Sequence, residues 1–195
     1  MLQILEISAT LFGLVQGILI WLNKKENWIF YILNISTLIA FSFISKLYGD
    51  VLENLIYLVI GIIGTTIWYN KNIGNKVFST SYCTMLERLK FSLISIAVMV
   101  ICYIWLIYTD DPMPVLDAVT TGLGITATIM MAIKKVEAWI VWLVDDILMA
   151  IIYFNLPDQA VYLGMLNIVW ILLAILSFVN WHMESERSKD EIKGT

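Results

Sequence analysis

Long apolar stretches alternate with short polar connections along this chain. A helix needs about 20 mostly apolar residues to cross a bilayer, and residues 27–45, 91–109 and 159–183 contain no Asp, Glu, Lys or Arg. The longest connection, residues 71–90, holds Gly, Asn, Ser and several basic residues, which is typical of a linker. The whole pattern predicts an all-α membrane protein with seven spans: 5–23, 28–45, 51–70, 89–108, 115–133, 138–155 and 159–181.

Basic residues sort almost entirely to one side of these seven predicted helices. When the loops are assigned alternately, one side receives only Lys46. The other side receives the rest: Lys24, Lys25, Lys71, Lys76, Arg88, Lys90, Lys134, Lys135, Arg187, Lys189 and Lys193. Because basic loops remain in the cytoplasm, we expect the N-terminus outside and the C-terminus in the cytoplasm. One helix more or fewer in mid-chain would destroy this sorting.

The composition supports a membrane protein and argues against several other classes. Of the 195 residues, 60% are hydrophobic and 14% charged, and the mean hydropathy is +0.83. A soluble domain is about half apolar and about a quarter charged. Two Cys and one His leave almost no material for a metal site, and the scattered basic residues form no nucleic-acid footprint. We therefore expect no metal, no cofactor and no nucleic-acid partner.

Two parts of the sequence resemble each other. Residues 27–43 and 138–154 each follow a Lys pair and open on a Trp, with another aromatic residue three positions after that Trp. Polar residues come six or seven positions after it. Further on, residues 54–64 and 167–177 share an Asn, an aromatic residue and a small residue at the same spacing. The match over two successive helices indicates an internal repeat.

The repeat divides the chain into four parts. Residues 1–70 and 111–183 are interpreted as two three-helix units in the same orientation. Residues 71–110 supply a cytoplasmic linker and one connecting helix, and residues 184–195 a charged cytoplasmic tail. Transporters built from such repeats bind substrate near the bilayer midplane, between the halves.

Aromatic, amide and acidic side chains gather on particular helix faces. At about 100° per residue, Trp139, Trp142, Asp146 and Tyr153 share one narrow face, whereas Asp145 points about 100° away. Aromatic rings stack on heterocycles and attract cations, while amides and carboxylates orient a ligand through hydrogen bonds. We predict that this face binds substrate together with residues of the other repeat helices: Trp28, Tyr31, Asn34, Asn54, Tyr57, Asn167 and Trp170.

Some of these candidates have structural alternatives. Trp28 and Trp139 stand at the starts of their helices, where an aromatic belt at the membrane interface is the competing interpretation. Asn54 and Asn167 are equally well interpreted as hydrogen-bond partners between helices.

The two adjacent aspartates are the most specific signal. A carboxylate at the centre of a membrane helix costs about 2.5–3.5 kcal/mol and normally faces a cavity or a partner. No Lys or Arg lies deep in any predicted span. The competing interpretations are a proton shared by Asp145 and Asp146, or a hydrogen bond to one of the nearby hydroxyls: Thr120, Thr121, Thr126 and Thr128. Because the two carboxyls diverge, they cannot form the facing pair of an aspartyl protease, and we expect no enzymatic activity.

The chain resembles the PnuC-type vitamin transporters, whose type member carries nicotinamide riboside. The similarity covers nearly the whole length, including the segments ATLFGLVQGILIWL and LYGD, and is most specific from residue 117 to residue 154. The matching positions there are Asp117, Thr120, Thr121, Lys134, Lys135, Glu137, Trp139, Trp142, Asp146 and Tyr153. The resemblance implies a 3+1+3 arrangement similar to the SWEET transporters, in a bacterial inner membrane. It also implies facilitated diffusion, trapping of substrate by a cytoplasmic kinase, and a homo-oligomer, often a trimer.

Two departures from this family bear on the substrate. Asn54 stands where relatives that carry nicotinamide riboside often have Gln, and Asn167 stands where they often have Tyr. The family resemblance makes nicotinamide riboside the first expectation, although the two Asn residues would leave more room and change the hydrogen-bond pattern. A nucleoside or deoxynucleoside, thiamine and riboflavin are the alternatives, and a proton-coupled carrier that uses Asp146 is the alternative mechanism.

Overall fold

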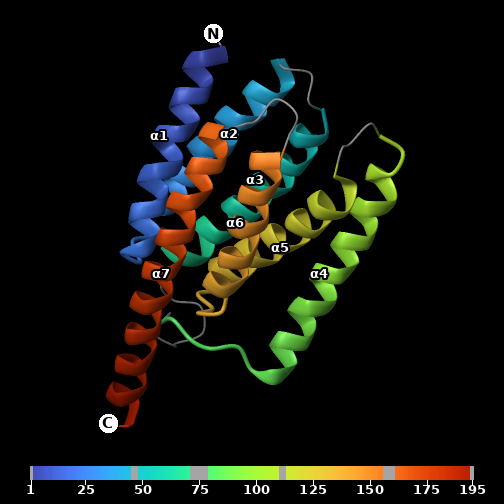
Figure 1. Ribbon diagram of the computed structural model, residues 1–195. Coiled ribbons are helices and arrows are strands. Elements are labelled where there is room, and N and C mark those ends of the chain that lie inside the picture. The colour runs from blue at the N-terminus through green and yellow to red at the C-terminus, as the bar shows by residue number, and fades with distance from the viewer. Residues whose placement is uncertain (1, 45–47, 71–78, 110–112, 156–160, 194–195) are drawn as a thin grey trace. The chain divides into compact units, whose positions relative to one another are not determined.

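The computed structural model describes residues 2–44, 48–70, 79–109, 113–155 and 161–193. Within these ranges the chain forms seven helices, shown in Figure 1: α1 (Leu2–Trp21), α2 (Asn27–Ile44), α3 (Tyr48–Tyr69), α4 (Met85–Leu106), α5 (Pro114–Ala132), α6 (Ala138–Asn155) and α7 (Val161–Lys193). The predicted all-α class and the seven helices are confirmed. Helices suit such an apolar chain because a bilayer offers no water to satisfy backbone N–H and C=O groups.

Length and apolar composition mark several of these helices as able to cross a membrane. Four described segments meet both requirements: Asn27–Ile44, Met85–Leu106, Pro114–Ala132 and Gly164–Asp190. Ile7–Trp21 and Glu53–Tyr69 are shorter apolar helices.

Helix α7 extends further than the sequence pattern indicated. The predicted span ended at residue 181, but the helix continues through the charged tail to Lys193. Glu, Lys and Arg in this tail are strong helix formers, and Lys189 forms an ion pair with Glu186 one turn earlier, at 2.7 Å. The polar end of α7 is therefore helical because of its local sequence.

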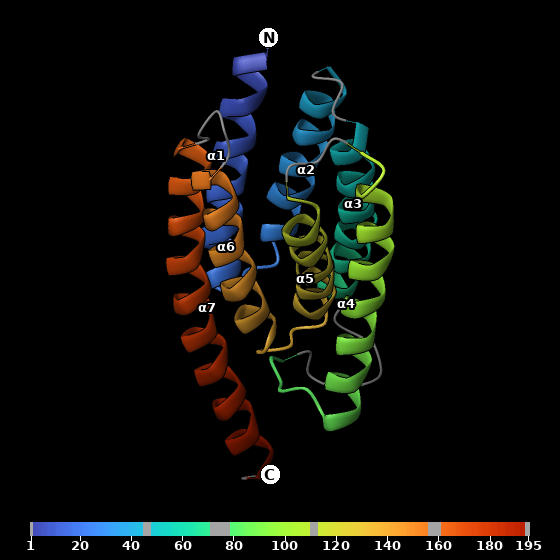
Figure 2. The ribbon, with the colours of Figure 1, turned by 45° about the vertical axis from the view of Figure 1, so that its right-hand side comes forward.

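The chain divides into two compact units. The first contains Met1–Ser79 together with Ala132–Lys134, and within it α1 packs on α2 and α2 packs on α3. The second contains Thr80–Met131 and Lys135–Thr195, and within it α6 packs on α7. Figures 1 and 2 both show α6 and α7 side by side.

Two glycines allow α2 and α3 to pack closely in the first unit. A Cβ added at Gly61 would lie 2.7 Å from the Tyr31 ring, and one added at Gly64 would lie 2.4 Å from the Trp28 ring. Larger residues would therefore push both rings away. The small residue at position 61 thus lets the Tyr31 ring approach α3 closely.

The α1–α2 and α5–α6 turns have the same backbone geometry. Asn23 and Lys134 both have a positive φ, 53° and 55°, as expected for the residue that ends a helix in the left-handed conformation. After each of them a backbone N–H reaches back five residues, from Lys24 to the carbonyl of Leu19 at 2.8 Å and from Lys135 to that of Met130 at 2.9 Å. The two turns therefore lead into the next helix with the same backbone geometry, and a Trp, Trp28 or Trp139, is the second residue of that helix.

Candidate functional site

Trp28 lies at the centre of an aromatic cluster in the first unit. Its side chain is 0% exposed and packs edge-on against Tyr31, at 5.4 Å between ring centroids, and against Trp68, at 6.0 Å. Such tilted contacts are the favoured arrangement of aromatic pairs. A ring with no exposed surface is not part of an interfacial belt, so the belt interpretation of Trp28 is not supported.

Trp68 also contacts the end of α5 and the turn that follows it. Its indole N–H donates to the carbonyl of Ala132 at 3.0 Å, and the Lys134 ammonium lies 4.4 Å from its ring centroid. Both partners belong to the same unit as Trp68. The sequence interpretation did not single out Trp68, although it stands as far after Asn54 as Trp181 stands after Asn167.

The remaining candidates of the first unit differ in their contacts. The Asn34 amide nitrogen donates to the carbonyl of Ala9 in α1 at 2.7 Å. This bond ties α1 to α2 and occupies one of the side chain's polar atoms. Asn54 and Tyr57 are half-buried on α3.

Trp139 occupies a similar aromatic environment in the second unit. It is 5% exposed, and its ring meets Trp181 of α7 at 5.2 Å and 90°. Trp181 is 0% exposed and was not predicted. The indole nitrogens of Trp28 and Trp139 are both buried, with no hydrogen-bond partner among the described residues. Trp142, one turn further along α6, is half-buried and is the more accessible ring for stacking.

Both aspartates of α6 are buried. Asp145 is 6% exposed and Asp146 is 8% exposed, although their side chains point in different directions around the helix. Among the described residues, no ion pair involves Asp146. The face that carries Trp139 and Trp142 therefore includes a carboxyl group removed from water.

Two threonines of α5 donate their hydroxyl protons within their own helix. Thr120 donates to the carbonyls of Leu116 and Asp117, at 3.1 Å and 3.0 Å, and Thr128 donates to that of Gly124, at 2.8 Å. Their hydroxyl protons are thus used within α5 itself. The interpretation in which Thr120 or Thr128 satisfies an aspartate gains no support.

On α7, Asn167 is 9% exposed, Trp170 is half-buried, and the small residue Ala174 is 2% exposed. Tyr153 belongs to α6, but its side chain lies outside the described residues. Within the described part of the chain, no group of three His, Cys, Asp or Glu residues is placed to hold a metal ion.

Comparison with known proteins identifies the family. The profile of the family described as "Nicotinamide mononucleotide transporter" matches residues 3–183. The chain belongs to this family. The resemblance to PnuC-type transporters is thereby confirmed, and the chain is a multi-pass protein of the bacterial inner membrane.

Individual relatives of this transporter family agree with that assignment. The chain is similar to a protein of Neisseria mucosa named "Nicotinamide riboside transporter PnuC", with 24% identity over 183 residues that cover 89% of this chain and 70% of the relative. It is also similar to a solved structure titled "Crystal structure of the Vitamin B3 transporter PnuC". That likeness has a TM-score of 0.76 and 22% identity, covering 94% of this chain and 82% of the other, and it shows a shared fold.

Proposed function

We propose that this protein carries nicotinamide riboside, or a closely related heterocyclic nucleoside, across the inner membrane by facilitated diffusion. The family and the name of the Neisseria relative support a vitamin carrier. The observation that carries the substrate proposal is the α6 face, where Trp139 and Trp142 accompany the buried carboxyl of Asp146. Nicotinamide riboside has a flat cationic ring, which suits both aromatic stacking and a nearby carboxylate.

A phosphorylated substrate suits this face less well. A phosphate ester carries a charge of about −1.5 to −2 near neutral pH and is usually held by Arg or Lys. Helices α2 and α6 contain no Arg and no Lys. A phosphate beside Asp146 would therefore meet a like charge, which favours the nucleoside over the nucleotide.

The proposed substrate contacts are assigned for each unit separately. In the second unit, Trp142 stacks on the substrate ring, Asp146 faces its charged or polar edge, and Trp139, Tyr153, Asn167 and Trp170 complete the set. In the first unit the set is Trp28, Tyr31, Asn54 and Tyr57. Asn34 is the weakest member, because its amide nitrogen is bonded to Ala9.

The two-copy organisation of the helices, 3+1+3 as in the SWEET transporters, is part of the same proposal. It is supported by the matching turns at Asn23 and Lys134 and by the two edge-on tryptophan pairs, Trp28 with Trp68 and Trp139 with Trp181. The distribution of basic residues supports an outside N-terminus and a cytoplasmic C-terminus. Homo-oligomers, trimers by family analogy, and trapping of substrate by a cytoplasmic kinase complete the proposal.

Uptake by liposomes that contain the purified protein tests this function. Nicotinamide riboside should enter without any ion gradient and equilibrate at the external concentration, while nicotinamide mononucleotide should enter far more slowly. Thiamine, riboflavin, adenosine and deoxyadenosine serve as competitors. Accumulation above the external concentration, in vesicles without kinase, would refute facilitated diffusion. If a neutral nucleoside competes more strongly than unlabelled nicotinamide riboside, that nucleoside is the better substrate and the proposed one is wrong.

A proton-coupled carrier is the second candidate, favoured by the burial of Asp146 without a described ion pair. Such groups often belong to proton relays in membrane proteins. The substitution Asp146→Asn separates the candidates. Transport that persists but loses its response to a pH gradient supports coupling, whereas weaker substrate binding in a protein that never responded to pH supports a ligand contact.

A further inference from the structure

A short segment before α4 is bonded to the turn between α5 and α6. We call this segment, residues 80–88, the brace. The backbone N–H of Val136 donates to the carbonyl of Ser81 at 3.1 Å, forming an isolated parallel bridge between Ser81 and Lys135. Both carboxylate oxygens of Glu137 accept the backbone N–H of Cys83, at 3.0 Å and 2.9 Å. The brace therefore lies against the chain immediately before α6.

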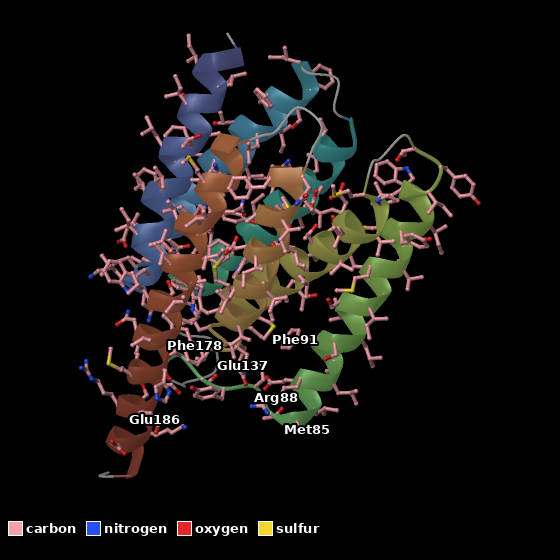
Figure 3. The ribbon with its side chains drawn as sticks, viewed as in Figure 1. Met85, Arg88, Phe91, Glu137, Phe178 and Glu186 are labelled. Atoms are coloured by element: carbon pink, nitrogen blue, oxygen red, sulfur yellow. The ribbon has the colours of Figure 1, made fainter. Side chains whose placement is uncertain are left out.

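Arg88 adds a charged contact to the same carboxylate. Its guanidinium donates to Glu137 Oε1 from Nη2 at 3.0 Å and from Nε at 3.3 Å. Figure 3 places Arg88 near the start of α4, with Glu137 beside it. The Glu137 side chain is 14% exposed and that of Arg88 is 56% exposed. Glu137 is thus the sheltered centre of the contact.

A second ion pair joins the same end of the brace to the α5–α6 turn. Lys135 donates to Glu87 at 2.9 Å, and Glu87 forms a capping box with Thr84 at the start of α4. Glu87 and Glu137 therefore pin α4 to the α5–α6 turn at two points.

The brace also reaches α7. The hydroxyl of Thr80 donates to the carbonyl of Trp181 at 3.2 Å, and the hydroxyl of Tyr82 lies 2.7 Å from Nδ1 of His182. Trp181 is the residue whose ring packs against Trp139. One segment thus contacts the start of α6 and the part of α7 that supports Trp139.

The first unit offers a natural comparison. Glu26 precedes Trp28 by the same two positions that separate Glu137 from Trp139, and Asn23 provides the same positive-φ turn before it. The Glu26 side chain is exposed, and no hydrogen bond or ion pair of its carboxylate is found among the described residues. The glutamate is common to both turns, but only Glu137 is bonded to a brace.

We propose that Glu137 is a positioning residue for substrate binding: through Cys83 and Arg88 it holds the start of α6 so that Trp139 and Trp142 face the substrate. This inference rests on the proposed function. Because coupling between two sites is reciprocal, a substrate that needs the braced position of α6 also tightens the brace. Substrate should therefore protect brace residues that it does not touch.

Cys83 provides a built-in reporter of the brace. Its side chain is 6% exposed, and burial, followed by the negative charge of Glu137, raises the pKa of the thiol to about 12. Only the thiolate reacts readily with maleimides, so Cys83 should react slowly while the brace is in place. Replacing Cys102 in α4, the other cysteine of the chain, by Ser leaves Cys83 as the single labelled position.

The experiment uses the full chain in lipid nanodiscs, with C102S as the parent. It compares Glu137→Gln with the matched control Glu26→Gln. Calorimetry gives the Kd for nicotinamide riboside, and maleimide labelling with and without this ligand gives the reactivity of Cys83. We expect the ligand to slow labelling of the parent. E137Q should raise the Kd about tenfold, the scale of one lost charged hydrogen bond, and speed labelling, while E26Q should match the parent.

Arg88 keeps the test decisive if E137Q fails to fold. Arg88→Ala should raise the Kd several-fold, and Arg88→Lys, which retains the positive charge, should restore most of the affinity. Two results would refute the positioning role alone, provided that the parent binds the ligand. One is a Kd in the folded variants equal to that of the parent, and the other is a rate of Cys83 labelling that is the same with and without the ligand. A parent that binds none of the nucleosides and vitamins would instead refute the proposed function on which it rests.

Discussion

Replacing Gly64 by Ala tests whether Trp28 is confined as tightly as the structure indicates. The added Cβ would lie 2.4 Å, 2.5 Å and 2.7 Å from three atoms of the Trp28 ring, whereas ordinary contacts begin near 3.4 Å. The ring must therefore retreat by about 1 Å. Because Trp28 is 0% exposed and packs against Tyr31 and Trp68, no open space receives it.

The expected magnitude follows from two opposing effects. Overpacking a buried site costs about 1–3 kcal/mol, while exchanging Gly for Ala within a helix returns up to about 1 kcal/mol. The net loss is about 1 kcal/mol, which lowers the Tm by about 2–4 °C for a chain of this size. If Trp28 also contacts substrate, the Kd for nicotinamide riboside rises in the same variant.

Thermal unfolding in detergent and calorimetry measure both effects. Ser177 is a matched control, since it stands as far after Asn167 as Gly64 stands after Asn54. It is 0% exposed, and its hydroxyl has no hydrogen-bond partner among the described residues. Ser177→Ala keeps the Cβ and removes an unsatisfied polar atom, so it should leave the Tm equal or slightly higher. An unchanged Tm and Kd in Gly64→Ala would show that the Trp28 ring moves freely, and would refute the argument.

Two further predictions concern α6 and the brace. Trp142→Ala should weaken binding of the best ligand at least tenfold in calorimetry with little loss of Tm, since this ring is only half-buried; unchanged affinity would exclude stacking on Trp142. In the C102S parent, alkylation of Cys83 by iodoacetamide should still rise about tenfold per pH unit between about pH 7 and 10, because burial raises the pKa of this thiol to about 12, whereas an ordinary thiol levels off near its pKa of about 8.5; a plateau near pH 9 would contradict the raised pKa.

Local sequence was sufficient to identify several parts of this protein. Long apolar segments predicted seven helices because the period and length of an apolar segment are properties of that segment alone. The start of α4 was predicted at residue 89, but the capping pair Thr84 and Glu87 begins the helix at Met85, through bonds within four residues. Side-chain order around α6 likewise placed Trp139, Trp142 and Asp146 on one face.

Partners distant in sequence required the tertiary structure. Trp68 and Trp181 resemble any other tryptophan near a helix end, and only the packing of α2 on α3 and of α6 on α7 makes them the supports of Trp28 and Trp139. Glu137 was noticed only as part of a family motif, because its partners Cys83 and Arg88 lie 54 and 49 residues away.

The two groups of features differ in the sequence distance over which their causes act. Hydrophobic period and helix propensity act over a few neighbouring residues, so the sequence by itself determined the helices and the faces they present. Burial and pairing depend on which helix lies opposite. The tertiary structure therefore decided that Asn34 bonds to Ala9, that Asp145 and Asp146 are both buried, and that Glu137 is braced while Glu26 remains exposed.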